Sequence, residues 1–254
     1  MIGIVGGVGP YAGIDLLKKV YDNTNAHTDQ EHLDTALLSL SSSIKDRTEY
    51  LEGKIKENPA NAITKVLLRL ERIGVTVAGI PCNTAHSEGI FDVIQKQLKV
   101  ARSSLKLLNM ITETIKFIKQ NYPDIKTIGV LSTTGTYNSG IYSKEILKEG
   151  YKIIVPTMKI QKELIHPAIY DFTYGIKSFS NPIKRKAIEN LQKGILFLKI
   201  EGAEAVILGC TEIPLAISQK KVEGVITIDP TNILARALIE NYLPDKLKKY
   251  NYND

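Results

Sequence analysis

The chain contains two cysteines, Cys82 and Cys210, and each follows a short apolar segment that is typical of a buried strand. Gly74 lies eight residues before Cys82, and Gly202 lies eight residues before Cys210. A thiolate can accept a proton and a thiol can donate one, so two matched cysteines can deprotonate one face of a carbon and reprotonate the other. That reaction inverts a stereocentre. The cysteine pair therefore predicts a racemase.

The residues that follow each cysteine favour a helix, and the positive end of a helix stabilises a thiolate. We therefore expect one thiol to be ionised and the other to be protonated at neutral pH. Two other interpretations stay open. The cysteines can be small buried core residues, or they can form a redox pair, although they lie 128 residues apart and the chain has no Cys-x-x-Cys motif.

Strand-like segments alternate with helical patterns along most of the chain, which predicts an α/β fold with parallel sheets covered by helices. The expected strands are residues 2–5, 35–40, 75–80, 105–108, 126–131, 152–155, 205–208 and 225–228. The expected helices include residues 14–21, 60–73 and 186–199, in which apolar side chains recur at helical spacing.

The second half of the chain repeats the first. Gly3 precedes Cys82 by 79 residues, and Gly129 precedes Cys210 by 81 residues. We therefore expect two similar lobes related by a pseudo-twofold axis, with the active site in the cleft between them, where strand carboxyl ends meet. Lobe 1 is expected to comprise residues 1–106, completed by a C-terminal helix within 230–254, and lobe 2 residues 107–229.

Composition excludes several classes of protein. With 43% hydrophobic and 24% charged residues the chain is globular rather than disordered. No run of eighteen apolar residues lacks a charge, which argues against a membrane partner, and the N-terminal residues resemble no leader, so we expect a cytoplasmic protein. The net charge of +6 comes from lysine-rich runs beside helices, which predicts no nucleic-acid partner. Cysteines and histidines are too scattered for a metal site.

Four motifs resemble signatures of the aspartate/glutamate racemase superfamily, above all of its aspartate racemase branch. They are Gly6-Gly7-Val8-Gly9-Pro10, Asp46-Arg47-Thr48, Pro81-Cys82-Asn83-Thr84-Ala85-His86 and Leu208-Gly209-Cys210-Thr211-Glu212-Ile213-Pro214-Leu215. The resemblance implies a pyridoxal-phosphate-independent amino-acid racemase with two Rossmann-like lobes, no cofactor, and frequently a homodimeric state. It also implies that Cys82 and Cys210 act as the catalytic acid and base.

The same resemblance implies a set of substrate-binding residues. Arg47 corresponds to the residue that binds the side-chain carboxylate of a dicarboxylic amino acid, which suits its bidentate guanidinium. Lys177 fits a family lysine that precedes the second cysteine, although Lys184 and Lys186 lie nearby. The remaining binding positions implied are Gly9, Asn83, Thr84, Thr133, Thr136, Thr211 and Glu212.

Several departures and alternatives accompany this resemblance. Val8 replaces a common methionine, and Lys45 stands where a proline often occurs. Glu212 occupies a position that is histidine in glutamate racemases, which favours aspartate and leaves glutamate or a broad range of amino acids open. His86 could relay protons or only pack.

The sequence also contains features of two other classes of function. Residues 7–12 match the dinucleotide pattern Gly-x-Gly-x-x-Ala, but Pro10 removes a backbone donor and no acidic residue follows at the expected distance. A non-catalytic amino-acid-binding protein on this fold also stays open, because a fold does not fix an activity.

Overall fold

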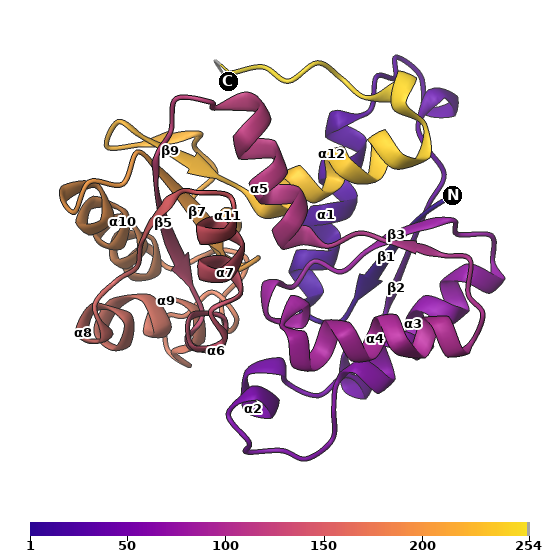
Figure 1. Cartoon of the computed structure of the whole chain (residues 1–254), viewed down its shortest axis with the longest axis horizontal. Coiled ribbons are helices and arrows are strands. Elements are labelled where there is room, and N and C mark those ends of the chain that lie inside the picture. Colours follow the sequence, from indigo (N-terminus) through magenta and orange to yellow (C-terminus); the bar gives the residue numbers. More distant parts are fainter. Residues whose placement is uncertain (253–254) are drawn as a thin grey trace. The chain divides into compact units, whose positions relative to one another are not determined.

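The computed structural model describes residues 1–252, and the chain divides into two compact units (Figure 1). Unit 1 comprises Met1–Glu113 and Thr231–Asp254, and unit 2 comprises Thr114–Pro230. Each unit is built on a mainly parallel sheet with helices, which confirms the expected α/β fold class.

The sheet of unit 1 has the strand order β2-β1-β3-β4, and all its strands are parallel. The strands are β1 (Ile2–Gly6), β2 (Thr35–Ser39), β3 (Val77–Gly79) and β4 (Lys106–Leu107). Its helices are α1 (Pro10–Asn23), α2 (Arg47–Leu51), α3 (Ala60–Arg72), α4 (Glu88–Val100) and α12 (Pro230–Tyr242). Because neighbouring strands run in the same direction, the segments after β1, β2 and β3 leave the sheet at one edge.

Alternating residues of β1 face two different hydrophobic clusters, as the two-residue period of a strand requires. Ile2 and Ile4 pack in a cluster with residues of α1 and α12, whereas Val5 belongs to a cluster with residues of α3 and α4. All three side chains are fully buried. The sheet is therefore covered on both faces, which explains why β1 reads as a continuous apolar run.

The sheet of unit 2 has the order β6-β5-β7-β9-β8. Its strands are β5 (Thr127–Ser132), β6 (Lys152–Ile154), β7 (Ala205–Gly209), β8 (Lys221–Val222) and β9 (Val225–Ile228). Strands β6-β5-β7-β9 are parallel and occur in the same order as the four strands of unit 1, which agrees with the repeat in the sequence. The short antiparallel strand β8 was not expected; it pairs with β9 through a tight turn in which Glu223 has a positive φ of 52°.

The helices of unit 2 include one unexpected element. They are α5 (Met110–Asn121, which begins in unit 1), α6 (Thr134–Ser139), α7 (Ile141–Lys148), α8 (Met158–Ile160), α9 (His166–Tyr170), α10 (Arg185–Ile200) and α11 (Ile213–Ala216). Between α8 and α9, Gln161–Ile165 forms a π-helical turn. Such turns are rare and occur often at functional sites.

The two glycines that lie eight residues before the cysteines end helices. Gly74 follows α3 with a φ of +96°, and Gly202 follows α10 with a φ of +98°. Beyond α3, the amide of Gly74 donates to Glu71 and that of Val75 to Leu70, which closes the helix end. A left-handed residue at this position favours glycine because it has no Cβ. The segment from each glycine to the following cysteine therefore spans the same elements in both units: the end of a helix, a buried strand and the start of the segment after that strand.

The expected element boundaries differ from the structure mainly at helix ends. Helix α1 begins at Pro10 rather than near residue 14, because proline is well tolerated at the first helical position. Strand β3 begins at Val77 rather than at residue 75, since Val75 belongs to the turn that ends α3. Within residues 1–252, no helix is long and apolar enough to cross a lipid bilayer.

Candidate active site

The loop after β1 approaches the loop after β2 closely in unit 1. Gly7 has a φ of +82°, and a Cβ at this position would lie 2.7 Å from the backbone nitrogen of Ser41. Glycine is required both by that conformation and by that contact. Gly9 follows as the N-cap of α1, and its carbonyl accepts the amide of Gly13 at 3.1 Å. The amide groups at the start of this helix can bind an anion such as a carboxylate.

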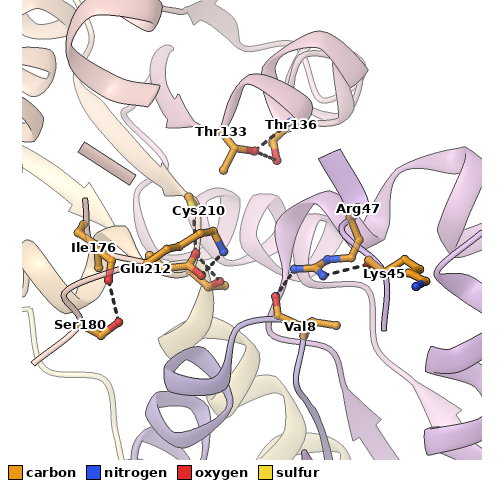
Figure 2. A network of polar contacts seen from close by, with 11 residues as sticks. Val8, Lys45, Arg47, Thr133, Thr136, Ile176, Ser180, Cys210 and Glu212 are labelled. Atoms are coloured by element: carbon orange, nitrogen blue, oxygen red, sulfur yellow. Dashed lines mark hydrogen bonds and ion pairs between the residues drawn. The ribbon is translucent and has the colours of Figure 1, made fainter. Parts of the chain in front are cut away.

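Arg47 is held against the loop after β1. It is the first residue of α2, whose N-cap Asp46 accepts the amide of Glu49 at 3.0 Å. The Arg47 guanidinium donates to the carbonyl of Val8 and, at 3.1 Å, to that of Lys45 (Figure 2). With only 8% of its surface exposed, the side chain is fixed in position rather than solvated. A buried guanidinium of this kind can pair with a carboxylate.

Cys82 lies three residues beyond β3, in extended conformation, and is buried. It is the N-cap of a 3₁₀ turn, Asn83–His86, whose residues, among them Asn83 and Thr84, are buried as well. The structure therefore brings Cys82, Asn83 and Thr84 together in one turn.

His86 closes the same turn and is neutral. Its Nε2 lies 3.1 Å from the carbonyl oxygen of Ile80, and its ring packs against Phe91 with the centroids 4.9 Å apart. Burial lowers the pKa of His86 to about 4. This environment supports a packing role for His86 rather than proton relay.

In unit 2, Thr133 and Thr136 form the cap of α6. The hydroxyl of Thr133 accepts the amide of Thr136 at 3.2 Å and donates to the Thr136 hydroxyl at 3.1 Å (Figure 2). In the sheet register Ser132 pairs with Gly209. Thr133 and Cys210 therefore leave two adjacent strands from paired positions, which places both at the carboxyl edge of this sheet.

Cys210 is part of a buried polar network. Its Sγ donates a hydrogen bond to Oε2 of Glu212 at 2.9 Å, as Figure 2 shows. The other carboxylate oxygen, Oε1, lies 2.7 Å from the ammonium of Lys177. The hydroxyl of Thr211 lies 3.4 Å from the same Oε2. The exposed fractions are 4% for Cys210 and 6% for Glu212. One buried carboxylate thus joins a thiol and an ammonium group.

The Cys210 thiol is protonated at neutral pH. Burial raises its pKa well above the usual value, and the charge of Glu212 raises it further, while the Lys177 charge only partly offsets these effects. The expectation that a helix N-terminus would favour the thiolate is therefore wrong for Cys210. Helix α11 has one turn and begins only at Ile213, so its dipole is small and is outweighed by burial and a neighbouring carboxylate.

Lys177 remains charged in this network. Burial lowers its pKa, but the Glu212 carboxylate outweighs burial and the net effect is a raised pKa. Its ammonium also lies 5.3 Å from the centre of the Tyr170 ring. The two nearby lysines point elsewhere: Lys184 lies over the Phe179 ring and Lys186 over the Tyr174 ring, at 4.7 and 4.0 Å. Of these three lysines, Lys177 is the one that contacts Glu212.

Two residues at this edge of the unit 2 sheet were not identified from the sequence. Gln161, in the π-helical turn, is fully buried and donates from Nε2 to the carbonyl of Ser132 at 3.0 Å. Tyr142 is also buried, and its ring lies against Gly209. Neither belongs to a motif, and no sequence signal marks the π-helical turn that places Gln161. Among residues 1–252, no group of three or more His, Cys, Asp or Glu side chains is arranged to hold a metal ion.

Comparison with known proteins gives consistent matches. A family model described as Asp/Glu/Hydantoin racemase matches residues 5–238. An aspartate racemase from Picrophilus torridus has 30% sequence identity, and its structure aligns with a TM-score of 0.80 over 99% of this chain and 96% of its own. A broad-specificity amino-acid racemase from Bacillus subtilis is 27% identical over 96% of this chain and 98% of its own.

A more distant structure shares the fold. A glutamate racemase from Francisella tularensis, in complex with D-glutamate, is 20% identical and aligns with a TM-score of 0.63 over 99% of this chain and 84% of its own. The family model spans most of the chain, and the Picrophilus torridus and Bacillus subtilis relatives align over 96% and 98% of their own length. The chain therefore belongs to the Asp/Glu/hydantoin racemase family, and racemases are isomerases.

Proposed function

We propose that this chain is a cofactor-independent aspartate racemase that interconverts L- and D-aspartate by a two-base mechanism. The observation that carries the proposal is the placement of Cys82 and Cys210 just beyond β3 and β7, which are the third strands in two sheets of the same strand order. The 30% identity to the Picrophilus torridus aspartate racemase supports aspartate as the substrate.

In the proposed reaction one proton is removed from Cα and another proton is added to the opposite face of the same carbon. A cysteine thiolate removes the α-proton, and the second cysteine, as a thiol, delivers a proton to the opposite face of the planar intermediate. Because Cys210 is held as a thiol by burial and by Glu212, we assign it as the proton donor at the start of the cycle. Cys82 is then the initial base. In the reverse direction the two residues exchange roles.

The proposed substrate contacts follow from charge and burial. Arg47, with its buried guanidinium, is assigned to the side-chain carboxylate. The remaining groups assigned to the α-carboxylate, the ammonium and the developing negative charge are Gly9, Asn83, Thr84, Thr133, Thr136, Thr211, Lys177 and Glu212. Acid–base catalysis alone contributes about 10²–10⁴-fold, so these preorganised polar groups must supply most of the acceleration.

The test is racemisation in D₂O by the purified chain without pyridoxal phosphate. We expect deuterium at Cα of recovered aspartate, and we expect Cys82→Ala and Cys210→Ala each to abolish inversion. Val66→Ala is a matched control, since it truncates a buried side chain of α3 that is assigned no role in the reaction. Inversion retained in either cysteine variant, with the control active, would refute the two-base assignment.

The broad-specificity relative favours a second candidate, a racemase that accepts several amino acids. A panel of L-amino acids analysed on a chiral column separates the two: inversion of aspartate alone supports the first, and inversion of neutral amino acids supports the second. Binding of aspartate without inversion would instead indicate a non-catalytic binding protein. The homodimer and the cytoplasmic location implied by the sequence remain predictions, to be tested by sedimentation and by imaging of the tagged chain.

A further inference from the structure

Unit 1 contains a cavity beside α3 that the racemase reaction does not use. Its volume is about 240 Å³, and it is open to solvent. A protein cavity of about 150 Å³ binds benzene, so this one has room for a ligand about one and a half times that size. The two cysteines, Arg47 and the other residues assigned to racemisation do not line it.

One face of α3 presents hydrogen-bond donors to this cavity. Asn61, Lys65 and Arg69 line it at intervals of four residues, so their side chains form a row with a spacing of about 6 Å. The Oδ1 atom of Asn61 accepts from Nε2 of Gln97 at 2.7 Å, which leaves its Nδ2 group as a donor. Ser43, in the loop after β2, adds a hydroxyl group. Such a row can bind the carboxylate groups of a ligand.

The charged side chains of the cavity do not pair with one another. Glu57 lines the same cavity as Lys65 and Arg69, yet none of the three forms an ion pair with any residue of 1–252. Lys65 and Arg69 are four residues apart on one helix, where like charges destabilise each other. An anionic ligand relieves that repulsion, and the Glu57 carboxylate is available for a cationic group of the same ligand.

We propose that this cavity is a second binding site of the chain, for a small dicarboxylic amino acid. Lys65 and Arg69 bind the two carboxylates, Glu57 binds the ammonium group, and apolar lining residues such as Leu40 and Ala62 contact the methylene carbons. The charges of the site are thus opposite, group by group, to those of the ligand. Glu57 argues against inorganic phosphate, because phosphate has no cationic group to offset this carboxylate.

The test is a titration of the full chain with L-aspartate, followed by NMR after labelling the alanines with ¹⁵N. The amide of Ala62 lies in α3 at the cavity, and that of Ala85 lies in the turn after Cys82, so one sample reports the two sites separately. The two signals are assigned by their absence in Ala62→Gly and Ala85→Gly. The titration uses Cys210→Ser, so that the ligand is not inverted during the measurement. We expect the Ala62 signal to shift and to saturate.

Variants of α3 test whether the Ala62 response arises in the cavity. Lys65→Gln and Arg69→Gln should each raise Kd about two- to fivefold, and both together about 4- to 25-fold, because a single exposed ion pair contributes little. Arg72→Gln is the matched control, since it removes an exposed arginine of the same helix that does not line the cavity. Equal Kd values in all of these variants would overturn the proposal.

Succinate separates an amino-acid site from a site for simple anions. It is aspartate without the ammonium group, so it should bind more weakly than aspartate, and Glu57→Gln should remove that difference. If succinate or inorganic phosphate binds as tightly as aspartate while Glu57 is in place, the assignment to an amino acid is wrong. An Ala62 signal that shifts with protein concentration and not with ligand also contradicts the proposal, because it indicates that a second copy of the chain covers the cavity.

Failure of this inference and failure of the proposed racemase function give different results. If the chain is not an aspartate racemase, the wild type does not invert aspartate, while the Ala62 response and its dependence on Arg69 persist. If the cavity binds no amino acid, the Ala62 signal stays fixed, while the wild type still inverts aspartate.

Discussion

Gly209 precedes Cys210 at the end of β7, and the structure leaves no space there for a side chain. A Cβ at this position would lie 2.9 Å from the carbonyl oxygen of Leu131, 3.1 Å from Cε2 of Tyr142 and 3.2 Å from Cβ of Ser132. The carbonyl belongs to the neighbouring strand β5 and cannot rotate away. Gly209→Ala must therefore displace β7 by a few tenths of an ångström, and overpacking of this kind costs about 1–3 kcal/mol.

Two measurements follow from that displacement. A loss of about 1–3 kcal/mol lowers the melting temperature by roughly 2–12 °C, at about 2–4 °C per kcal/mol for a chain of this size. Cys210 moves with the strand end, and a misplacement of 1 Å costs about 10²-fold in rate. A shift of about 0.3–0.5 Å therefore predicts a roughly four- to tenfold lower kcat for aspartate racemisation.

Gly89→Ala is the control for this substitution. A Cβ there meets only Leu51 Cδ2, at 3.9 Å, and Gly89 lies in α4, so the variant should be unchanged or up to about 1 kcal/mol more stable. Thermal unfolding and a chiral assay of the same preparations test both effects. If Gly209→Ala has the same melting temperature and the same kcat as the wild type, the argument from close packing is refuted.

Two further predictions concern the turns that carry the site. The pKa of His86 is about 4 when folded and near 6.5 when unfolded, so the unfolded chain binds the extra proton and stability falls as pH drops from about 6.5 to 4. The loss in the free energy of unfolding reaches about 3 kcal/mol. Denaturant titrations at several pH values should show that His86→Gln loses less stability than the wild type as the pH falls. Equal losses in the two proteins would contradict burial of a neutral imidazole. Thr133→Val removes the acceptor for the Thr136 amide and should cost about 1 kcal/mol in chemical denaturation, whereas Thr133→Ser keeps it; equal stability of the two variants would argue against the cap.

The repeated pattern around the two cysteines could be read from the sequence because it is built from local geometry. A glycine with positive φ ends a helix, a buried strand follows, and the cysteine comes eight residues after the glycine in both units. Each step depends on residues only a few positions apart. The alternation of strands and helices is local in the same way, which is why the α/β fold class was predictable.

The state of Cys210 was not predictable in this way. The helical tendency after the cysteine suggested a thiolate, but the helix has one turn and the thiol is buried against Glu212. Helix propensity describes only the neighbouring backbone. The pKa of a thiol depends on the balance of burial and nearby charges, and that balance exists only after folding.

By itself, the sequence determined the succession of elements, the two equivalent strand ends and the presence of one cysteine beyond each. Only the tertiary structure decided that Lys177, 35 residues before Glu212, and not Lys184 or Lys186, pairs with that carboxylate. The physical reason is that helix and strand patterns depend on interactions between residues only a few positions apart in the sequence. The path of a long loop, and the charge that it brings beside a buried thiol, are set by the packing of the whole unit.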